Sequence, residues 1–225
     1  MAGNSLSGKI VLITGASGAL GATVARHFRA MGARVTGVDR IAAEGVESVD
    51  LTDLGETQKF IDHLVVASAG IDVVCNIAGA FTMGEKVADL AGGQSWRAMF
   101  DTNVRTLLNI SAATAPHLVS SRGAMINIGA AAATKGVAGM GAYIASKSCV
   151  IRLTETMSQE LRSNGVNVNC VLPSIIDTPA NRASMPSAEF SDWVSPDDLA
   201  KVILFLASGA AKAIHGAAIP VTGML

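Results

Sequence analysis

The chain is poor in aromatic and charged residues, and these shortages exclude several classes of protein. Of its 225 residues, 4% are aromatic and 16% are charged, and only one is a tyrosine. Lys and Arg total 17 against 18 Asp and Glu, which gives a formal net charge of −1. Because no basic excess is available to neutralise phosphates, we expect no nucleic-acid partner. The hydrophobic content of 50% excludes a disordered chain.

Long apolar runs and paired cysteines are also missing. Mean hydropathy is +0.43, yet no uncharged stretch reaches the roughly 18 residues that a membrane-spanning helix needs. Cys75, Cys149 and Cys170 form no Cys-x-x-Cys motif and are odd in number, so free thiols in a reducing compartment are expected. The four histidines lack metal-ligand spacing. We therefore expect a cytoplasmic protein with no membrane partner and no metal.

Short apolar runs alternate with amphipathic segments along the whole chain. The expected strands are residues 9–14, 34–38, 46–49, 71–75, 123–128, 166–171 and 217–221. The expected helices are residues 19–31, 57–67, 96–118 and 141–163, and a last helix that begins after Ser195. Residues 79–93 and 173–194 are expected to be irregular. Since parallel neighbours need crossover helices, this order predicts an α/β fold with one doubly wound parallel sheet, in a single domain over residues 1–225.

A glycine-rich turn follows the first expected strand and opens the first expected helix. Glycines in such a turn let the backbone approach a pyrophosphate, and the helix N-terminus attracts the anion. The expected contacts to a dinucleotide are Gly15, Ser17, Gly18, Ala19, Leu20 and Gly21. Close packing of strand and helix is the alternative explanation of the same glycines.

Further cofactor contacts are expected where the next strands end. Asp39 ends the second strand, and a carboxylate there accepts both ribose hydroxyls and repels a 2′-phosphate, which favours NAD(H) over NADP(H). Arg40 beside it weakens that preference, because an arginine can pair with a 2′-phosphate. The remaining expected contacts are Asp50, Leu51, Asn76, Ala78 and Gly79.

Tyr143, the only tyrosine, precedes Lys147 by four residues in an expected helix, so both side chains share one face. The ammonium is expected to stabilise the phenolate and to lower the pKa of Tyr143, which is ordinarily about 10. Tyr143 then becomes a proton donor or acceptor near neutral pH. The same pair is also common on ordinary helix surfaces, so it indicates chemistry only together with the nucleotide turn.

Taken together, these motifs resemble the short-chain dehydrogenase/reductases over essentially the whole chain. The resemblance rests on residues 14–21, Asp39, residues 76–79, Asn103, the Tyr143-x-x-Ser146-Lys147 motif and residues 173–178. It implies a Rossmann fold with a seven-stranded sheet, a nicotinamide cofactor and hydride transfer coupled to proton transfer by Tyr143. It also implies a homo-oligomer, either tetramer or dimer, paired through the two long helices.

The resemblance further implies roles for individual residues. Asn103 matches the position that supports a proton-relay water near the lysine, and Lys147 also holds the nicotinamide ribose. Pro173, Ile176 and Thr178 match the segment that holds the nicotinamide carboxamide. Residues 174–194 then form a substrate-side loop or lid.

Two positions depart from the family pattern. Ala19 stands where the turn usually has its third glycine, and one methyl group there is tolerable in helical backbone. Ala130 stands thirteen residues before Tyr143, where the family places a catalytic serine. Loss of one such donor costs on the order of 10²–10³ in rate for reactions that depend on it. Thr134 is the nearest hydroxyl in sequence that is able to substitute.

One branch of the family, the dihydropteridine reductases, resembles this chain in lacking that serine. The segment 172–193 is similar to the substrate-side segment of that branch, and Phe81 lies where the branch has an aromatic residue able to stack on a pterin. A quinonoid dihydropterin accepts hydride without a serine that polarises a lone carbonyl. Phe81, Ala130, Thr134, Met140 and Trp193 are therefore the expected substrate contacts.

Two further classes remain as alternatives. Ala130 is compatible with a non-catalytic NAD(H)-sensing protein that binds a partner, although such a protein has no need of Tyr143 and Lys147. A methyltransferase-like Rossmann protein also uses a glycine-rich first turn, and it does not require that pair either. Retention of both residues favours the oxidoreductase.

Overall fold

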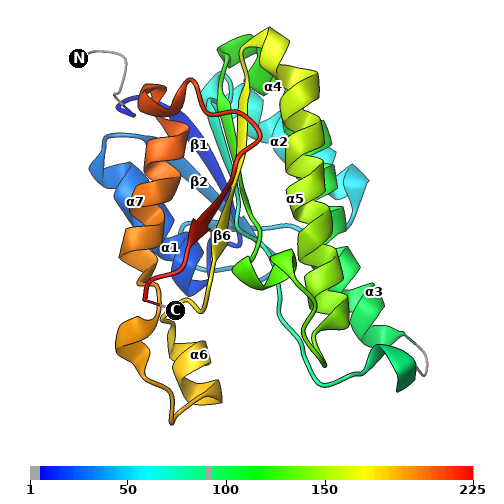
Figure 1. The fold of residues 1–225 in the computed structure, drawn as a ribbon. Helices are drawn as coiled ribbons and strands as arrows, with labels where there is room; N and C mark the ends of the chain where they lie inside the picture. The colour runs from blue at the N-terminus through cyan, green and yellow to red at the C-terminus, as the bar shows by residue number, and fades with distance from the viewer. Residues whose placement is uncertain (1–5, 90–92, 225) are drawn as a thin grey trace.

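Seven parallel strands form one sheet through the middle of the part of the chain that the computed structural model describes, residues 6–89 and 93–224 (Figure 1). Their order is β3-β2-β1-β4-β5-β6-β7. Strands β2 and β3 are added on one side of β1, and β4 to β7 are added in sequence on its other side. The strands are β1 Ile10–Thr14, β2 Arg34–Asp39, β3 Val46–Ser48, β4 Val73–Asn76, β5 Ala124–Ile128, β6 Asn167–Pro173 and β7 Ala218–Val221. The predicted doubly wound parallel sheet is confirmed.

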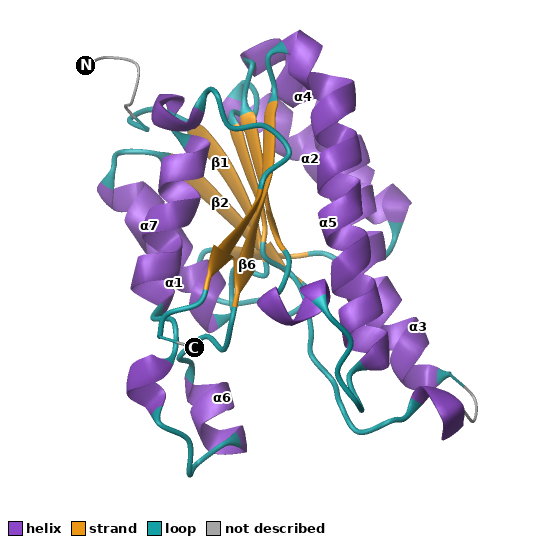
Figure 2. Cartoon of the chain, viewed as in Figure 1, coloured by secondary structure: helices purple, strands orange, loops and turns teal. Residues whose placement is uncertain are grey.

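Helices cover both faces of this sheet (Figure 2). They are α1 Ala19–Ala30, α2 Leu54–Ser68, α3 Gln94–Phe100, α4 Thr106–Ser121, α5 Gly141–Leu161, α6 Pro179–Ser184 and α7 Pro196–Ala207. Helices α1 and α7 lie on one face, and α2, α4 and α5 lie on the other (Figure 1). Each face has its own apolar core, with Phe28 of α1 fully buried in one and Ile61 of α2 fully buried in the other.

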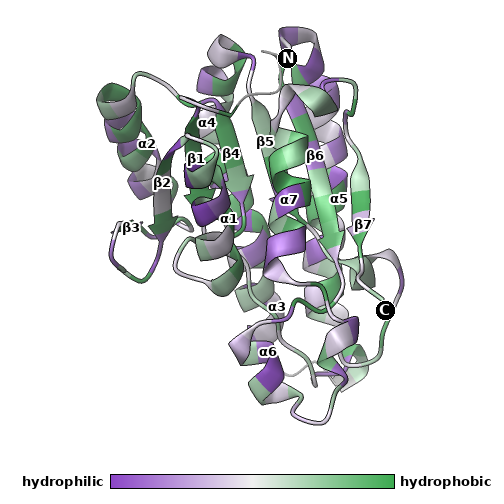
Figure 3. Ribbon diagram, turned by 90° about the vertical axis from the view of Figure 1, so that its left-hand side faces the viewer, coloured by the Kyte–Doolittle hydropathy of each residue, from purple (hydrophilic) through white to green (hydrophobic). Residues whose placement is uncertain are grey.

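The central strands are buried on both faces, and this explains their composition. Every residue of β1, β4 and β5 is buried. Strands of this kind need apolar side chains at successive positions instead of alternating polar and apolar ones. Figure 3 shows the hydrophobic colour concentrated on β4, β5 and β6. The continuous apolar runs in the sequence therefore predicted these strands well.

Three predicted elements differ from the structure. The expected helix 96–118 is interrupted, because a π-helical segment, Asp101–Arg105, separates α3 from α4. The second helix begins before residue 57, since the Asp53 carboxylate accepts a hydrogen bond from Glu56 N at 2.9 Å and caps it. The segment 173–194 contains α6, whose N-cap is Thr178. In the expected loop 79–93, residues 90–92 lie outside the described residues.

The strand register brings the polar strand ends to one end of the molecule. Thr14 at the end of β1 pairs with Val38 of β2 on one side and with Asn76 of β4 on the other. In an open parallel sheet, ligands bind beyond the carboxyl ends of the strands where the winding reverses. That place lies between β1 and β4 here, toward the end of the molecule occupied by α3 and α6 (Figure 1).

The described residues contain neither a membrane-spanning helix nor a cluster of metal ligands. Within residues 6–89 and 93–224, no helix has the length and apolarity to cross a membrane. The same residues contain no group of three or more His, Cys, Asp or Glu side chains placed to hold a metal ion. All three cysteines are free, and Cys75 and Cys170 are buried.

Candidate active site

The glycine turn between β1 and α1 is shaped for close approach of a ligand. Gly15 has φ +67°, and a Cβ on it would lie 2.8 Å from the backbone N of Ala78. A Cβ on Gly21 would lie 2.2 Å from Gly15 O. Only glycine fits at these two positions, because one requires left-handed backbone and the other has no space. The backbone of the turn is therefore packed against the segment that follows β4.

Helix α1 begins at this turn without a side-chain cap. Its N-cap is Gly18, and its first turn contains no acidic residue. The first N–H groups of a helix have no intrahelical partner, and the helix dipole is positive at this end. Helix α2, by contrast, has the Asp53 side chain on its first turn. The uncapped start of α1 fits a pyrophosphate, as expected for a dinucleotide site.

Asp39 borders the same turn from the end of β2. Its carboxylate accepts hydrogen bonds from Ser17 N at 3.2 Å and Ser17 Oγ at 2.5 Å. The other carboxylate oxygen accepts a hydrogen bond from Arg40 N at 2.8 Å. These bonds fix a negative charge beside the turn.

Lys147 and Asn103 converge on Gly79, just beyond β4. A Cβ on Gly79 would lie 2.9 Å from Asn103 Oδ1 and 3.1 Å from Lys147 Nζ. Lys147 is buried and donates a hydrogen bond to Ile128 O at 2.8 Å. Three elements that are distant in sequence, the loop after β4, the π-helical segment and α5, therefore meet at one point.

The π-helical segment holds Asn103 in place. Asn103 Oδ1 accepts a hydrogen bond from Ala80 N at 2.8 Å, and its Nδ2 donates to Ala80 O at 3.1 Å and to Ser146 Oγ at 3.0 Å. Ser146 Oγ in turn donates to Tyr143 O at 2.7 Å. Single π-helical turns inside α-helices are frequent at functional sites. Here the segment places a buried amide between the loop after β4 and the first turns of α5.

Burial, and not the neighbouring ammonium, dominates the titration of Tyr143. Removal of water raises the pKa of Tyr143 to about 12 and lowers the pKa of Lys147 to about 8. The expectation that Lys147 lowers the pKa of Tyr143 is therefore wrong for the cofactor-free protein. At neutral pH the side chains are a neutral phenol and an ammonium, a state in which Tyr143 is able to donate a proton.

Among the described residues, the hydroxyls of Thr134 and Ser148 do not replace the serine missing at position 130. Ala130 is 3% exposed and belongs to the core on the α5 face. Thr134 is exposed, donates its hydroxyl to Ala131 O at 2.8 Å, and lines a separate groove with Arg152 and Pro220. Ser148 Oγ donates to Ala133 O at 2.9 Å. The structure therefore does not bring Thr134 to Tyr143.

Phe81 is the expected substrate residue that does lie against Tyr143. The two rings meet edge to face, with centroids 4.9 Å apart and planes at 80°. Phe81 remains 55% exposed, so most of its ring is open to solvent. Met140 is partly buried directly before α5, where Ile144 N donates to its carbonyl oxygen at 2.9 Å. Phe81 therefore borders the ring of Tyr143, and Met140 directly precedes the helix that carries it.

The remaining expected cofactor residues are held by the protein itself. Asp50 accepts hydrogen bonds from Thr52 N and Oγ1 at 2.9 and 2.7 Å, which lower the pKa of its carboxyl. Leu51 is buried, and its carbonyl accepts from Asn109 Nδ2 at 2.9 Å. Asn76 Nδ2 donates to Asn127 Oδ1 at 2.9 Å, and the buried Asn76 Oδ1 has no hydrogen-bond partner among the described residues.

The segment after β6 folds back on itself beside the site. Ile176 pairs with Val194, and the Thr178 hydroxyl accepts a hydrogen bond from Asn181 N at 3.2 Å at the start of α6. Trp193 is 7% exposed, and its ring lies 4.8 Å from that of Phe190. Trp193 therefore anchors this segment, while Thr178 is occupied as a cap. Pro173 ends β6 directly before it.

Sequence reasoning gave no role to three groups that build the site. Thr14 Oγ1 accepts hydrogen bonds from Ile77 N and Ala78 N, both at 3.0 Å, and holds the loop after β4 against β1. Ser146 links Asn103 to Tyr143, and Ile128 O binds the ammonium of Lys147. A threonine before the glycine turn and a serine before the lysine were visible in the sequence, whereas a backbone carbonyl leaves no signal there.

A doubly wound sheet with a glycine turn, a buried lysine and a phenol at its carboxyl end is the arrangement of a Rossmann-type oxidoreductase. The family model described as short chain dehydrogenase matches residues 9–189. The chain belongs to the short-chain dehydrogenase family. Enzymes of this family use a nicotinamide cofactor, and the glycine turn, the uncapped start of α1 and Asp39 fit one.

Relatives with assigned activities span the length of the chain. It is 28% identical to a 3-oxoacyl-(acyl-carrier-protein) reductase of Thermotoga maritima, over 98% of each sequence. It is 29% identical to meso-2,3-butanediol dehydrogenase of Serratia marcescens, over 96% of this chain and 93% of that one. The ligand-free aldohexose dehydrogenase of Thermoplasma acidophilum has a TM-score of 0.89 at 27% identity, covering 99% of this chain and 96% of that one. These proteins act on different substrates, so similarity alone does not select one.

Proposed function

We propose that this chain is an NAD(H)-dependent oxidoreductase that transfers hydride to or from a small organic substrate, with Tyr143 as the proton donor or acceptor. The observation that carries the proposal is the convergence of Lys147 Nζ and Asn103 Oδ1 on Gly79. Gly79 directly follows Ala78, whose backbone packs against Gly15 of the glycine turn. This convergence supports the proposal because the Lys147 ammonium, the Asn103 amide and the glycine turn all border the loop after β4. A packing role alone does not require a buried ammonium at that point.

Each side chain has a distinct part in this mechanism. A bound nicotinamide would supply or accept the hydride, and the turn from Gly15 to Gly21 with the start of α1 would hold its pyrophosphate. Tyr143 presents a neutral phenol, which would donate a proton to the substrate oxygen or nitrogen. Lys147 would hold the ribose and stabilise the phenolate that forms. Asn103 positions Lys147 and supports the relay that returns a proton to Tyr143.

We infer a preference for NAD(H) from Asp39. Its carboxylate is fixed beside the turn by Ser17 and by the Arg40 backbone, where it is able to accept ribose hydroxyls. The 2′-phosphate of NADPH is repelled by this carboxylate. Conversion of Asp39 to Asn is expected to weaken NADH binding about tenfold and to narrow the preference over NADPH, as read by fluorescence titration of both cofactors.

Substitution of Tyr143 by Phe tests the main proposal. Turnover is expected to fall by at least 10²-fold, because only the proton-transfer group is removed, while the dissociation constant for NADH changes little. Thr134→Val, which removes a hydroxyl outside the site, serves as the control and is expected to retain full activity. Full activity in Tyr143→Phe contradicts the role given to the phenol. NADH binding with no turnover of any ketone, alcohol, quinone or dihydropterin by the unmodified protein favours an NAD(H)-sensing protein instead.

A more specific candidate is reduction of a quinonoid dihydropterin, and Ala130 is the observation that favours it. Thr134, which donates its hydroxyl to Ala131 O, does not replace the missing serine, and Tyr143 is the hydroxyl proposed to act on the substrate. The exposed ring of Phe81, held against Tyr143, offers a flat apolar surface to a conjugated ring. A conjugated acceptor disperses the incoming negative charge within itself and depends less on a second donor.

Ala130→Ser separates this candidate from ordinary carbonyl reduction. If the natural substrate is conjugated, the serine raises the rate with simple ketones at least tenfold and leaves the rate with quinonoid dihydropterin nearly unchanged. Phe81→Leu is expected to raise the KM for the pterin several-fold and to have little effect on small ketones. A wild-type enzyme that reduces simple ketones faster than dihydropterins contradicts the pterin candidate and leaves the oxidoreductase proposal intact.

A further inference from the structure

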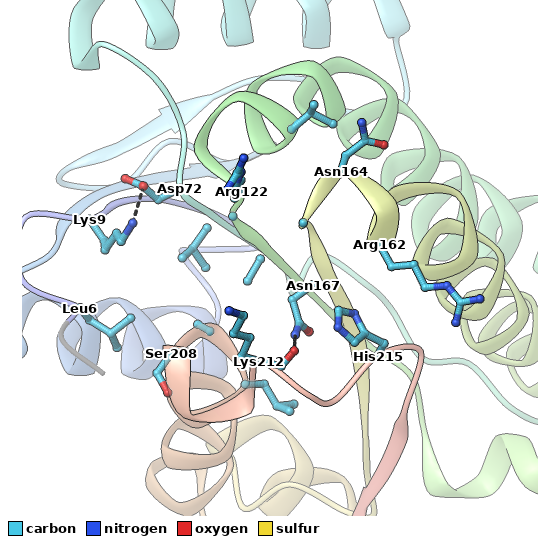
Figure 4. Close-up of a pocket in the computed structure, with 18 of the residues that line it drawn as sticks. Leu6, Lys9, Asp72, Arg122, Arg162, Asn164, Asn167, Ser208, Lys212 and His215 are labelled. Carbon is cyan, nitrogen blue, oxygen red and sulfur yellow. Dashed lines mark hydrogen bonds and ion pairs between the residues drawn. The ribbon is translucent and has the colours of Figure 1, made fainter. Parts of the chain in front are cut away.

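A second groove lies at the other end of the sheet, where the strands begin (Figure 4). It has a volume of about 920 Å³ and is bordered by the starts of β4, β5 and β6 and by the ends of α4, α5 and α7. Arg162, which lines it, follows Tyr143 by nineteen residues along α5, a distance of about 28 Å. We call this the amino-end groove. It is separate from the site of Tyr143 and Lys147.

Positive charge predominates among its lining side chains. The ionisable residues are Lys9, Asp72, Arg122, Arg162, Lys212 and His215. The only acid, Asp72, is occupied, because it accepts hydrogen bonds from Lys9 Nζ and Ile10 N, both at 2.8 Å. Within the described residues, the side chains of Arg122, Arg162, Lys212 and His215 have no ion pair and no hydrogen bond. The unpaired charge of the groove is therefore positive.

The positive charge of these side chains exceeds the negative charge at the nearby helix C-termini. Helices α4, α5 and α7 end beside the groove, and each C-terminus is equivalent to roughly −0.5 of a charge, or roughly −1.5 together. Arg122 and Arg162 directly follow α4 and α5, and Lys212 follows the short 3-10 turn Gly209–Ala211 after α7; together they supply three full positive charges. An excess of roughly one and a half positive charges remains.

Two glycines shape the wall that carries Arg122. A Cβ on Gly165 would lie 3.3 Å from Cγ and Cδ of Arg122, so the arginine stem packs over that glycine. A Cβ on Gly123 would lie 2.2 Å from Asp72 O. In Figure 4, Arg122 lies between Asp72 and Asn164, Lys212 and His215 approach from the opposite wall, and Arg162 points outward at the rim. Arg122 and Lys212 thus face one space from separate segments of the chain, and Arg162 lies at its rim.

We propose that the amino-end groove binds a small anion that carries two or more phosphate groups, held mainly by Arg122 and Lys212. Cations on opposite walls match an anion with charge at more than one point better than a single phosphate. The planar guanidinium of Arg122 donates paired hydrogen bonds to phosphate oxygens, and Lys212 and His215 add further nitrogen atoms. The proposal is independent of the oxidoreductase activity.

Calorimetric titration of the full chain with inorganic tripolyphosphate at low salt tests the proposal. The unmodified protein is expected to bind one equivalent, and the double variant Arg122→Gln/Lys212→Gln is expected to bind about tenfold more weakly or worse. Lys135→Gln, an exposed lysine outside the groove, is the matched control and is expected to leave the affinity unchanged. The unmodified protein, the double variant and Lys135→Gln are compared by circular dichroism, so a loss of fold is recognised.

A second titration, with ATP, distinguishes two sources of the phosphates. The difference between wild type and the double variant is compared for both ligands. If the double variant loses the same affinity for both ligands, the groove recognises the phosphates alone. If it loses more affinity for ATP, the groove also recognises the nucleoside. Both outcomes support the proposal. Absence of saturable binding overturns it. It is also overturned if Arg40→Gln, beside the glycine turn, abolishes tripolyphosphate binding while the double variant binds normally, or if Lys135→Gln weakens binding as much as the double variant does.

Discussion

At the scale of single residues, the surroundings of a side chain decide its chemistry more than its sequence neighbours do. The spacing of Tyr143 and Lys147 predicted correctly that the two belong to one helix. It did not predict that burial raises one pKa and lowers the other. Burial depends on β5, Phe81 and the π-helical segment, which come from elsewhere in the chain. The candidate site residues could therefore be found from sequence, but their protonation states could not.

The lowered pKa of Lys147 predicts a rise in stability just above neutral pH. The folded protein releases the lysine proton near pH 8, whereas the unfolded chain keeps it up to about 10.5. Between pH 8 and 9 the unfolded state keeps the lysine proton that the folded state has lost, and this contributes a rise of about 1 kcal/mol to the free energy of unfolding. The buried thiols of Cys75 and Cys170 act in the opposite direction from about pH 8 upward, because burial raises each pKa above its ordinary value of 9.0, and Tyr143 follows at higher pH. The thiols offset roughly half or more of the lysine contribution by pH 9, so the expected net rise is a few tenths of a kcal/mol.

Urea denaturation at closely spaced pH values measures this rise. Lys147→Met is expected to abolish it, and Lys135→Met, at an exposed position, is expected to retain it. If the free energy of unfolding still rises with pH in Lys147→Met, the titrating group is not Lys147.

Gly79 provides a second prediction at this scale. An alanine methyl group there is too close to Asn103 Oδ1 and Lys147 Nζ for both to stay in place. Gly79→Ala is expected to lower kcat at least tenfold, because the Lys147 ammonium and the Asn103 amide are displaced from their present positions. Gly136→Ala, where a Cβ has no neighbour within 4 Å and φ is not positive, is the control. Equal kcat values for the two variants contradict the convergence at Gly79.

At the scale of elements, periodicity and buried apolar runs predicted every strand and most helices. The failures have local causes. The π-helical segment Asp101–Arg105 adds one residue to a helical turn, and this small shift was not recognised within a segment whose apolar spacing predicted one long helix. Helix α6 is only six residues long and depends on the Thr178 cap, and the length of α2 depends on the Asp53 cap. Caps are visible in sequence only when their helix has already been located.

The cap of α7 was predicted, and its contribution can be measured. Ser195 Oγ accepts a hydrogen bond from Asp198 N at 3.0 Å and donates to Asp198 Oδ2 at 2.7 Å. Ser195→Ala is expected to lower the free energy of unfolding by about 1 kcal/mol. Ser120→Ala, in which the exposed hydroxyl only donates to Pro116 O, is expected to have almost no effect. Chemical denaturation monitored by circular dichroism compares the two variants.

At the scale of the whole molecule, we expect a homo-oligomer paired through α4 and α5, as the family resemblance implies. Leu108 on α4 is 42% exposed, which is consistent with an apolar contact between subunits. Leu108→Glu is therefore expected to shift sedimentation toward the monomer. Val66→Glu on α2, at a position that is 86% exposed, introduces the same charge on another helix and is expected to leave the oligomer intact. A monomeric wild-type protein contradicts the expectation.

The contact of Thr14 and Gly15 with residues 77–79 has a consequence for synthesis on the ribosome. The glycine turn and Asp39 are translated early, but the loop that packs on them follows β4, and Lys147 comes nearly seventy residues later still. A nascent chain that ends at β3 contains the adenosine side of the pocket with nothing to close it. On the proposed function, a coenzyme is therefore expected to stabilise only molecules in which the loop after β4 has already packed on the glycine turn.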